Sequence, residues 1–71
     1  MRSKFKFKFG DRVVVRCPLG YGHHGAVVEL HRPSKHVPHN GYLVSLDTPI
    51  PTYPGDDLTS VVYWEGYLEN E

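Results

Sequence analysis

The sequence has a single cysteine, Cys17, and no apolar run near the length of a membrane span. One cysteine cannot form a disulfide within the chain, and a membrane helix needs about 18 consecutive apolar residues. The basic start also lacks the apolar core of a secretory signal peptide. These absences exclude a disulfide-stapled domain and predict a protein of the reducing cytoplasm with no membrane contact.

An excess of charge of one sign is also lacking, because eight basic side chains balance eight acidic ones. Their distribution is uneven: residues 1–16 carry six basic residues and one acidic, whereas residues 47–71 carry six acidic residues and none basic. One interpretation is that strands from the two ends lie side by side and neutralise each other. The other is a basic patch for an acidic partner. The overall balance argues against a dedicated nucleic-acid binder, which needs several uncompensated cations.

No segment has the periodicity of a helix. Six prolines and seven glycines interrupt the chain, and the apolar residues alternate or form β-branched runs. The pattern predicts an all-β fold with five short strands at residues 11–17, 26–31, 42–47, 58–64 and 67–69. Five short strands in about 60 residues are typical of a small closed barrel, which leaves few bare edges.

Alternation within two of these strands predicts which side chains form the core. The predicted inward-facing residues are Val13, Val15 and Cys17 in the first strand, and Tyr42, Val44 and Leu46 in the third. Asn40-Gly41 predicts a tight turn with positive φ angles. Pro49, Pro51 and Pro54 predict an extended loop that continues to about Asp57.

The opening segment alternates strictly between lysine and phenylalanine. We expect residues 1–6 to form a basic, aromatic arm and residues 7–69 to form the barrel, with Phe7 and Phe9 closing its base and Phe5 fraying. The alternative is a ribbon that adds to a partner's sheet edge, joins copies of the chain, or binds single-stranded nucleic acid. The residues of this candidate ribbon are Lys4, Phe5, Lys6, Phe7 and Lys8.

Four segments carry a resemblance to a known family: Phe7-Lys-Phe-Gly-Asp-Arg-Val13, Gly25-Ala-Val27, Tyr42-Leu-Val44 and Trp64-Glu-Gly-Tyr-Leu-Glu69. Together they resemble the SH3-like barrel that ends the β subunit of nitrile hydratase, over residues 7–69. The resemblance extends more loosely to type II dihydrofolate reductase, a small photosystem I subunit and the variable chain of ferredoxin–thioredoxin reductase. It implies a free-standing five-stranded barrel that packs against a protein partner as a subunit or maturation accessory.

The resemblance implies no activity of the barrel itself. The metal of nitrile hydratase is held by a cysteine cluster in its α subunit. In the type II reductases four barrels surround a pore and a Val-Gln-Ile-Tyr motif supplies a glutamine. Setting Tyr63 on the tyrosine of that motif places Val61 where the glutamine belongs. We therefore expect no enzyme activity, no catalytic residue and no cofactor, and the oligomeric reductase remains an alternative.

The sequence has five histidines, which could in principle bind a metal ion: His23, His24, His31, His36 and His39. Their spacing does not fit a rigid tetrahedral ligand set, and adjacent histidines in a glycine-rich loop point in different directions. A set of His31, His36 and His39 with Cys17 is conceivable. We expect solvated loop imidazoles and no metal.

The predicted function is a docking or accessory module for a protein partner, with assembly of several copies and single-stranded nucleic-acid binding as alternatives. Aromatic side chains with few rotamers make efficient contact anchors. The predicted contact residues are Tyr21, His23 and His24 in the first loop, Tyr53 in the proline loop, and Tyr63 and Trp64. Because Tyr63 and Trp64 are adjacent in a strand, at least one of them must face inward.

Overall fold

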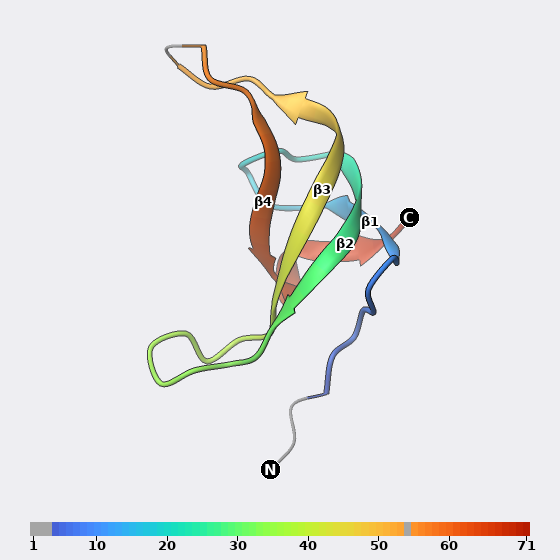
Figure 1. Cartoon of the computed structure of the whole chain (residues 1–71), viewed down its shortest axis with the longest axis vertical. Coiled ribbons are helices and arrows are strands. Elements are labelled where there is room, and N and C mark those ends of the chain that lie inside the picture. Colours follow the sequence, from blue (N-terminus) through green and yellow to red (C-terminus); the bar gives the residue numbers. More distant parts are fainter. Residues whose placement is uncertain (1–3, 54) are drawn as a thin grey trace.

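Five antiparallel strands form one sheet in the part of the chain that this computed structural model describes, residues 4–53 and 55–71 (Figure 1). The strand order is β4-β3-β2-β1-β5. The elements are β1 (Arg12–Val15), β2 (His24–His31), β3 (Gly41–Ile50), β4 (Leu58–Trp64), the 3₁₀ turn η1 (Glu65–Tyr67) and β5 (Leu68–Asn70). The all-β prediction is confirmed.

Strands from the two ends of the chain lie side by side. β1 pairs with β5 in an antiparallel register that places Val13 opposite Asn70 and Val15 opposite Leu68. Ion pairs accompany this pairing: Arg12 contacts Asp47 and, at 3.1 Å, Glu71, and Arg16 contacts Glu69 at 2.8 Å. The uneven charges therefore neutralise each other across the sheet, as predicted.

The core is one cluster to which every strand contributes. Its buried members are Phe7, Val13, Val15, Val27, Tyr42, Val44, Leu46, Ile50, Tyr63 and Leu68. Because all five strands surround the same cluster, the sheet curls around it, and β1 and β5 cross behind β2–β4 in Figure 1. The strand order leaves β4 and β5 as edges, so within the described residues the ring of backbone hydrogen bonds does not close. The predicted inward residues of β1 and β3 are confirmed, except that Cys17 lies beyond β1 and is half-buried.

Two loop predictions are wrong. Gly41 has no positive φ angle and begins β3, where it pairs with both His31 and Trp64. The predicted proline loop begins later than expected, because β3 passes through Pro49 and places Ile50 in the core, opposite Leu58. A register shift between Ser45 and Ile50 accommodates this extension. Pro54 lies outside the described residues.

The described part of the opening segment, residues 4–10, is not a strand, so the alternation of lysine and phenylalanine does not place the three phenylalanines on one face. Phe7 is fully buried and Phe5 packs against the core, but Phe9 is 72% exposed. A turn redirects the chain here: the Lys8 amide donates to the Asp11 carboxylate at 2.9 Å, and the Asp11 amide donates to the Lys8 carbonyl at 3.0 Å. The predicted fraying of Phe5 and the predicted burial of Phe9 are therefore wrong. Residues 1–3 of the predicted arm lie outside the described residues.

Candidate functional site

Trp64 lies at the centre of an exposed aromatic ladder at the end of β4. Its ring stacks on His39, with centroids 4.5 Å apart and an interplanar angle of 28°, and on Tyr67 at 6.2 Å and 28°. The side chains of Trp64, Tyr67 and the nearby Val62 are 44%, 40% and 50% exposed. Large apolar side chains are thus gathered where water reaches them. We call Leu19, Val62, Trp64 and Tyr67 the Trp64 surface.

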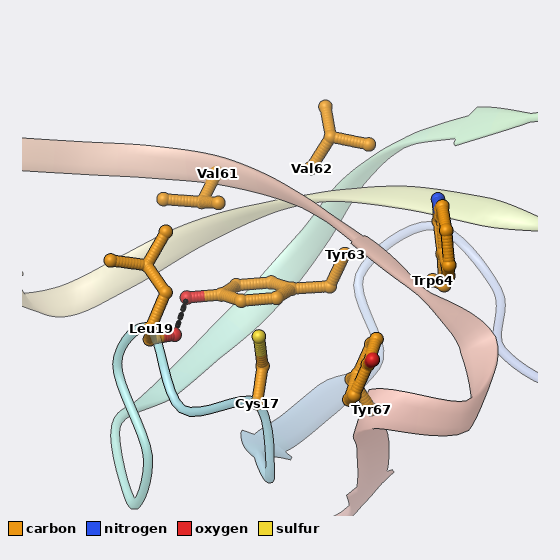
Figure 2. A pocket seen from close by; sticks show the side chains of 7 residues that line it. All are labelled: Cys17, Leu19, Val61, Val62, Tyr63, Trp64 and Tyr67. Atoms are coloured by element: carbon orange, nitrogen blue, oxygen red, sulfur yellow. Dashed lines mark hydrogen bonds between the residues drawn. The ribbon is translucent and has the colours of Figure 1, made fainter.

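A groove on one side of Trp64 follows the free edge of β4 (Figure 2). It is lined by Cys17, Leu19, Val61, Val62, Tyr63, Trp64 and Tyr67 and has a volume of about 220 Å³. Successive strand residues point to opposite faces, so a groove lined by four consecutive residues must lie at the strand's edge. Figure 2 shows Val62 pointing away from Tyr63, in keeping with this. We call this the edge groove.

Tyr63 supports the edge groove from within the core. It is only 3% exposed, and its hydroxyl donates to the Leu19 carbonyl at 2.9 Å (Figure 2). Burial raises the pKa of Tyr63, and the neighbouring Cys17 adds to this. Tyr63 is therefore a structural residue that fixes the loop opposite β4, whereas Trp64 provides the exposed surface.

A second hollow lies on the other side of Trp64, over the start of β3. It has a volume of about 380 Å³ and is lined by His31, Arg32, Ser34, Val37, His39, Gly41, Val62 and Trp64. His31, Gly41 and Trp64 are cross-strand neighbours in one row. A Cβ at position 41 would lie 3.4 Å from the His31 Cβ and 3.6 Å from Val62 Cγ1. A Cβ there would make only ordinary van der Waals contacts, and Gly41 itself is buried although it lines the hollow. We call this the glycine hollow.

The end of the molecule that holds the glycine hollow is basic. Within the described ranges, Arg32 and Lys35 of the β2–β3 loop form no ion pair, and His31 pairs with Glu29 at 2.6 Å. The opening segment reaches the same end, because the Asn40 side-chain amide donates to the Lys4 carbonyl at 2.6 Å. In Figure 1 this end lies at the bottom, opposite the β3–β4 loop that carries Asp56 and Asp57.

A polar cluster holds the opening segment in place. The Tyr42 hydroxyl accepts from the Lys6 amide at 2.9 Å and the Phe7 amide at 3.3 Å and donates to Glu65. Burial raises the pKa of Tyr42 to about 12, and the Glu65 carboxylate adds to the effect. Burial opposes ionisation of Glu65, but hydrogen bonds from Tyr42, Asn40 and the Lys6 amide outweigh it and hold the pKa of Glu65 below its usual value.

The other predicted contact residues lie on separate surfaces. Tyr21, His23 and His24 line a different hollow, with Asp47 and Thr48. The Nδ1 atom of His23 lies 2.9 Å from the Thr48 carbonyl, and that of His24 lies 2.9 Å from Glu71.

Tyr21 is held by Arg16, whose guanidinium lies 5.6 Å from the centroid of its ring. Tyr53 is 98% exposed in the β3–β4 loop, at the opposite end of the molecule from the glycine hollow (Figure 1). The structure therefore does not bring the predicted contacts into one site.

Several residues of the Trp64 surface and its hollows were not predicted. Leu19 and Val62 carry no distinguishing motif, and Tyr67 entered only as part of the closing segment of the family resemblance. Arg32 lies outside the predicted strands, and Gly41 was expected in a tight turn. One signal was present: Val62 and Trp64, two positions apart in a strand whose other face holds Tyr63, place large apolar side chains on the solvent side.

Two negative findings concern metal-ligand clusters and membrane-spanning helices in residues 4–53 and 55–71. No group of three or more histidine, cysteine or acidic side chains in these ranges is placed to hold a metal ion. No helix there has the length and apolar character that crossing a bilayer requires. No protein-family model, curated protein or solved structure matches the chain.

Proposed function

We propose that the chain is a non-catalytic, SH3-like binding module that docks a protein partner through the Trp64 surface, as a subunit or accessory of that partner. The observation that carries the proposal is the contiguous exposure of Val62, Trp64 and Tyr67 beside the edge groove. Tryptophan and tyrosine dominate the energetics of protein interfaces, and large exposed apolar patches mark interaction sites. Five antiparallel strands curled around one core support the SH3-like part of the proposal.

The position of the groove favours an extended partner segment. Among the residues that the structure describes, β4 is an edge strand, so no strand of this part of the chain pairs with its outward backbone amides and carbonyls. An extended chain laid along such an edge gains backbone hydrogen bonds, while its side chains enter the flanking pockets. The edge groove provides such a pocket, walled by Leu19 and Tyr67 on the side away from β4.

The alternatives fit the surface less well. A nucleic-acid base needs a free aromatic face, but the Trp64 ring already stacks on His39 and Tyr67. The type II reductase resemblance needs an amide at position 61, and the residue there is Val61, on the wall of an apolar groove.

Selection of displayed random dodecapeptides on the folded protein tests the proposal. We expect peptides that bind the wild-type protein and lose about 30-fold in affinity on Trp64→Ala, as for an interface hot spot. Tyr53→Ala is the matched control, because it also removes an exposed aromatic ring, and it should leave the affinity unchanged.

Three outcomes would contradict the proposal. Selected peptides could depend on Tyr53 and not on Trp64, which would move the contact surface to the β3–β4 loop. Sedimentation could show a wild-type oligomer that Trp64→Ala dissociates, which would make the occupant a second copy. NADPH could shift the amide resonances of residues lining the edge groove, which would revive the reductase hypothesis.

A further inference from the structure

We propose that the partner segment is acidic as well as apolar: one apolar side chain fills the edge groove, and a nearby carboxylate enters the glycine hollow and meets Arg32. This inference rests on the proposed function and specifies the chemistry of the ligand. It makes Gly41 and Arg32 specificity-determining residues.

The first step concerns Gly41. The glycine is not required by the backbone, since its φ angle is not positive. It is not required by close packing either, since the nearest atoms to an added Cβ are at 3.4 Å or more. At Gly25, by contrast, an added Cβ would lie 2.6 Å from Val44 Cγ1. Gly41 lines the hollow between His31 and Trp64 although it is itself buried, so a larger side chain at position 41 would take up part of the hollow.

The second step concerns charge. The residues that line the glycine hollow include Arg32, His31 and His39. Two carboxylates lie near these residues and are engaged within the protein: Glu29 by His31 at 2.6 Å, and Glu65, which follows Trp64, by Tyr42 and by the Asn40 side-chain amide at 2.9 Å. Arg32 is thus a cation without a carboxylate partner among the described residues, in a hollow that Trp64 also lines. A planar guanidinium binds a carboxylate through two parallel hydrogen bonds. The charge complement of this hollow is an acidic side chain.

The third step concerns geometry. Val62 and Trp64 line both the edge groove and the glycine hollow, so the two sites adjoin across the Trp64 ring. Extended chain rises about 3.3 Å per residue with alternating side chains, so residues about two or three positions apart reach both sites. The aliphatic walls, Leu19 in the groove and Val37 in the hollow, favour a peptide over a nucleic-acid strand.

The same selection of random dodecapeptides tests this ligand chemistry. We expect enrichment of Asp or Glu about two or three positions from a large apolar residue. One selected acidic peptide and its amide counterpart, with Asp→Asn or Glu→Gln, are then titrated against wild type and Arg32→Gln. The acidic peptide should lose about tenfold in affinity on Arg32→Gln, whereas the amide counterpart should lose less than about twofold.

Gly41→Val places a branched side chain in the glycine hollow and should likewise abolish the preference for the acidic peptide. Gly41→Ala adds a single methyl group, whose contacts are ordinary, and should reduce the preference less. Both variants are checked by circular dichroism. Arg16→Gln, which removes an arginine from another part of the surface, is the control and should leave the preference intact. Arg16 pairs with Glu69 and does not line the glycine hollow. The Arg16→Gln variant therefore tests whether the loss of one positive charge anywhere on the surface explains the weaker binding of the acidic peptide.

Failure of this inference is distinguishable from failure of the proposed function. Peptides that depend on Trp64 but bind Arg32→Gln and Gly41→Val as well as wild type would overturn the acidic ligand and leave docking in place. Peptides indifferent to Trp64 would overturn both. Tight binding of fluorescein-labelled oligo(dT), weakened on Arg32→Gln and by raising salt from about 50 to about 200 mM, would replace the acidic peptide with nucleic acid.

Discussion

Replacement of Tyr42 by phenylalanine is predicted to loosen residues 4–7 and to destabilise the protein. The Tyr42 hydroxyl joins the opening segment to the sheet, because it accepts from the amides of Lys6 and Phe7 and donates to Glu65. The ring itself makes T-shaped contacts with Phe5 and Phe7, at centroid distances of 5.8 and 5.3 Å. Tyr42→Phe retains these aromatic contacts and removes the hydroxyl alone.

The magnitude follows from the groups left without partners. Lys6 keeps a second acceptor, because its amide also donates to Glu65 at 3.0 Å. The amide of Phe7, a fully buried residue, loses its acceptor. A buried donor without a partner costs about 1–3 kcal/mol. For a domain of this size, that corresponds to a fall in Tm of roughly 4 to 24 °C.

Thermal unfolding followed by circular dichroism measures this difference. Tyr63→Phe is the matched control, since it removes another buried-ring hydroxyl whose single acceptor is the carbonyl of the half-exposed Leu19. Water can replace that donor, so the control should lose less than about 1 kcal/mol. A Tyr42→Phe variant as stable as Tyr63→Phe, with unchanged amide exchange at residues 6 and 7, would refute the assignment of Tyr42 as the anchor.

The same variant carries a pH signature. Burial raises the pKa of Tyr42 to about 12, above that of a tyrosine in the unfolded chain. The folded state thus favours the neutral phenol. Its contribution to stability is complete below about pH 10 and is lost as the pH rises from about 10 to about 12. Wild type should lose more stability in this window than Tyr42→Phe, and the raised pKa of Tyr63 affects both proteins alike.

Three further predictions concern stability, each measured by denaturant or thermal unfolding. Gly20 and Gly22 have similar positive φ angles, +84° and +86°, so alanine costs about 1–2 kcal/mol at either. Gly20→Ala should cost about 1–3 kcal/mol more, because its Cβ would also meet Ile50 and lie 2.7 Å from the Tyr63 hydroxyl; equal losses would contradict this. Leu68→Ala should cost about 2–5 kcal/mol through the cavity it leaves, and half-exposed Leu19→Ala much less. Hydrogen bonds hold the pKa of Glu65 below its usual value although burial raises it, so wild type loses stability as this carboxylate protonates below about pH 4.5. Glu65→Gln has no carboxylate at this position and should lose less stability over the same pH range.

The alternation of apolar and polar residues in the strands was the most informative pattern in the sequence, because it predicted which side chains form the core. Val13 and Val15 in β1, and Tyr42, Val44 and Leu46 in β3, alternate with more exposed residues, and all five are in the core. Such patterns succeed because strand geometry alone decides which side chains share a face.

Predictions from short local signals failed where distant residues decided the outcome. Asn40-Gly41 has the composition of a tight turn, yet cross-strand pairing with His31 and Trp64 extends Gly41 as part of β3. The side chain of Asn40 instead bridges Lys4 and Glu65. Likewise, Pro49 is held within a strand because the next residue, Ile50, is buried.

The candidate site could not be read from the sequence because it is assembled from several separate segments. Its walls come from residues 17–19, 31–41, 61–64 and 67. Alternation established that Tyr63 and Trp64 face opposite sides but not which one faces inward. The pairing of Tyr63 with Tyr42, a core residue, decides this in favour of a buried Tyr63.

The two edges of the sheet differ in a way that bears on the proposed docking. An exposed edge strand invites pairing with other chains, and proteins commonly protect it with charged side chains. β5 is protected in this way, since Glu69 within the strand pairs with Arg16, and Glu71, which directly follows the strand, pairs with Arg12. β4 carries no charged residue and exposes Val62 and Trp64. An uncovered apolar β4 would favour aggregation. A charged β5 edge together with an apolar β4 edge is therefore the arrangement expected if a partner covers β4.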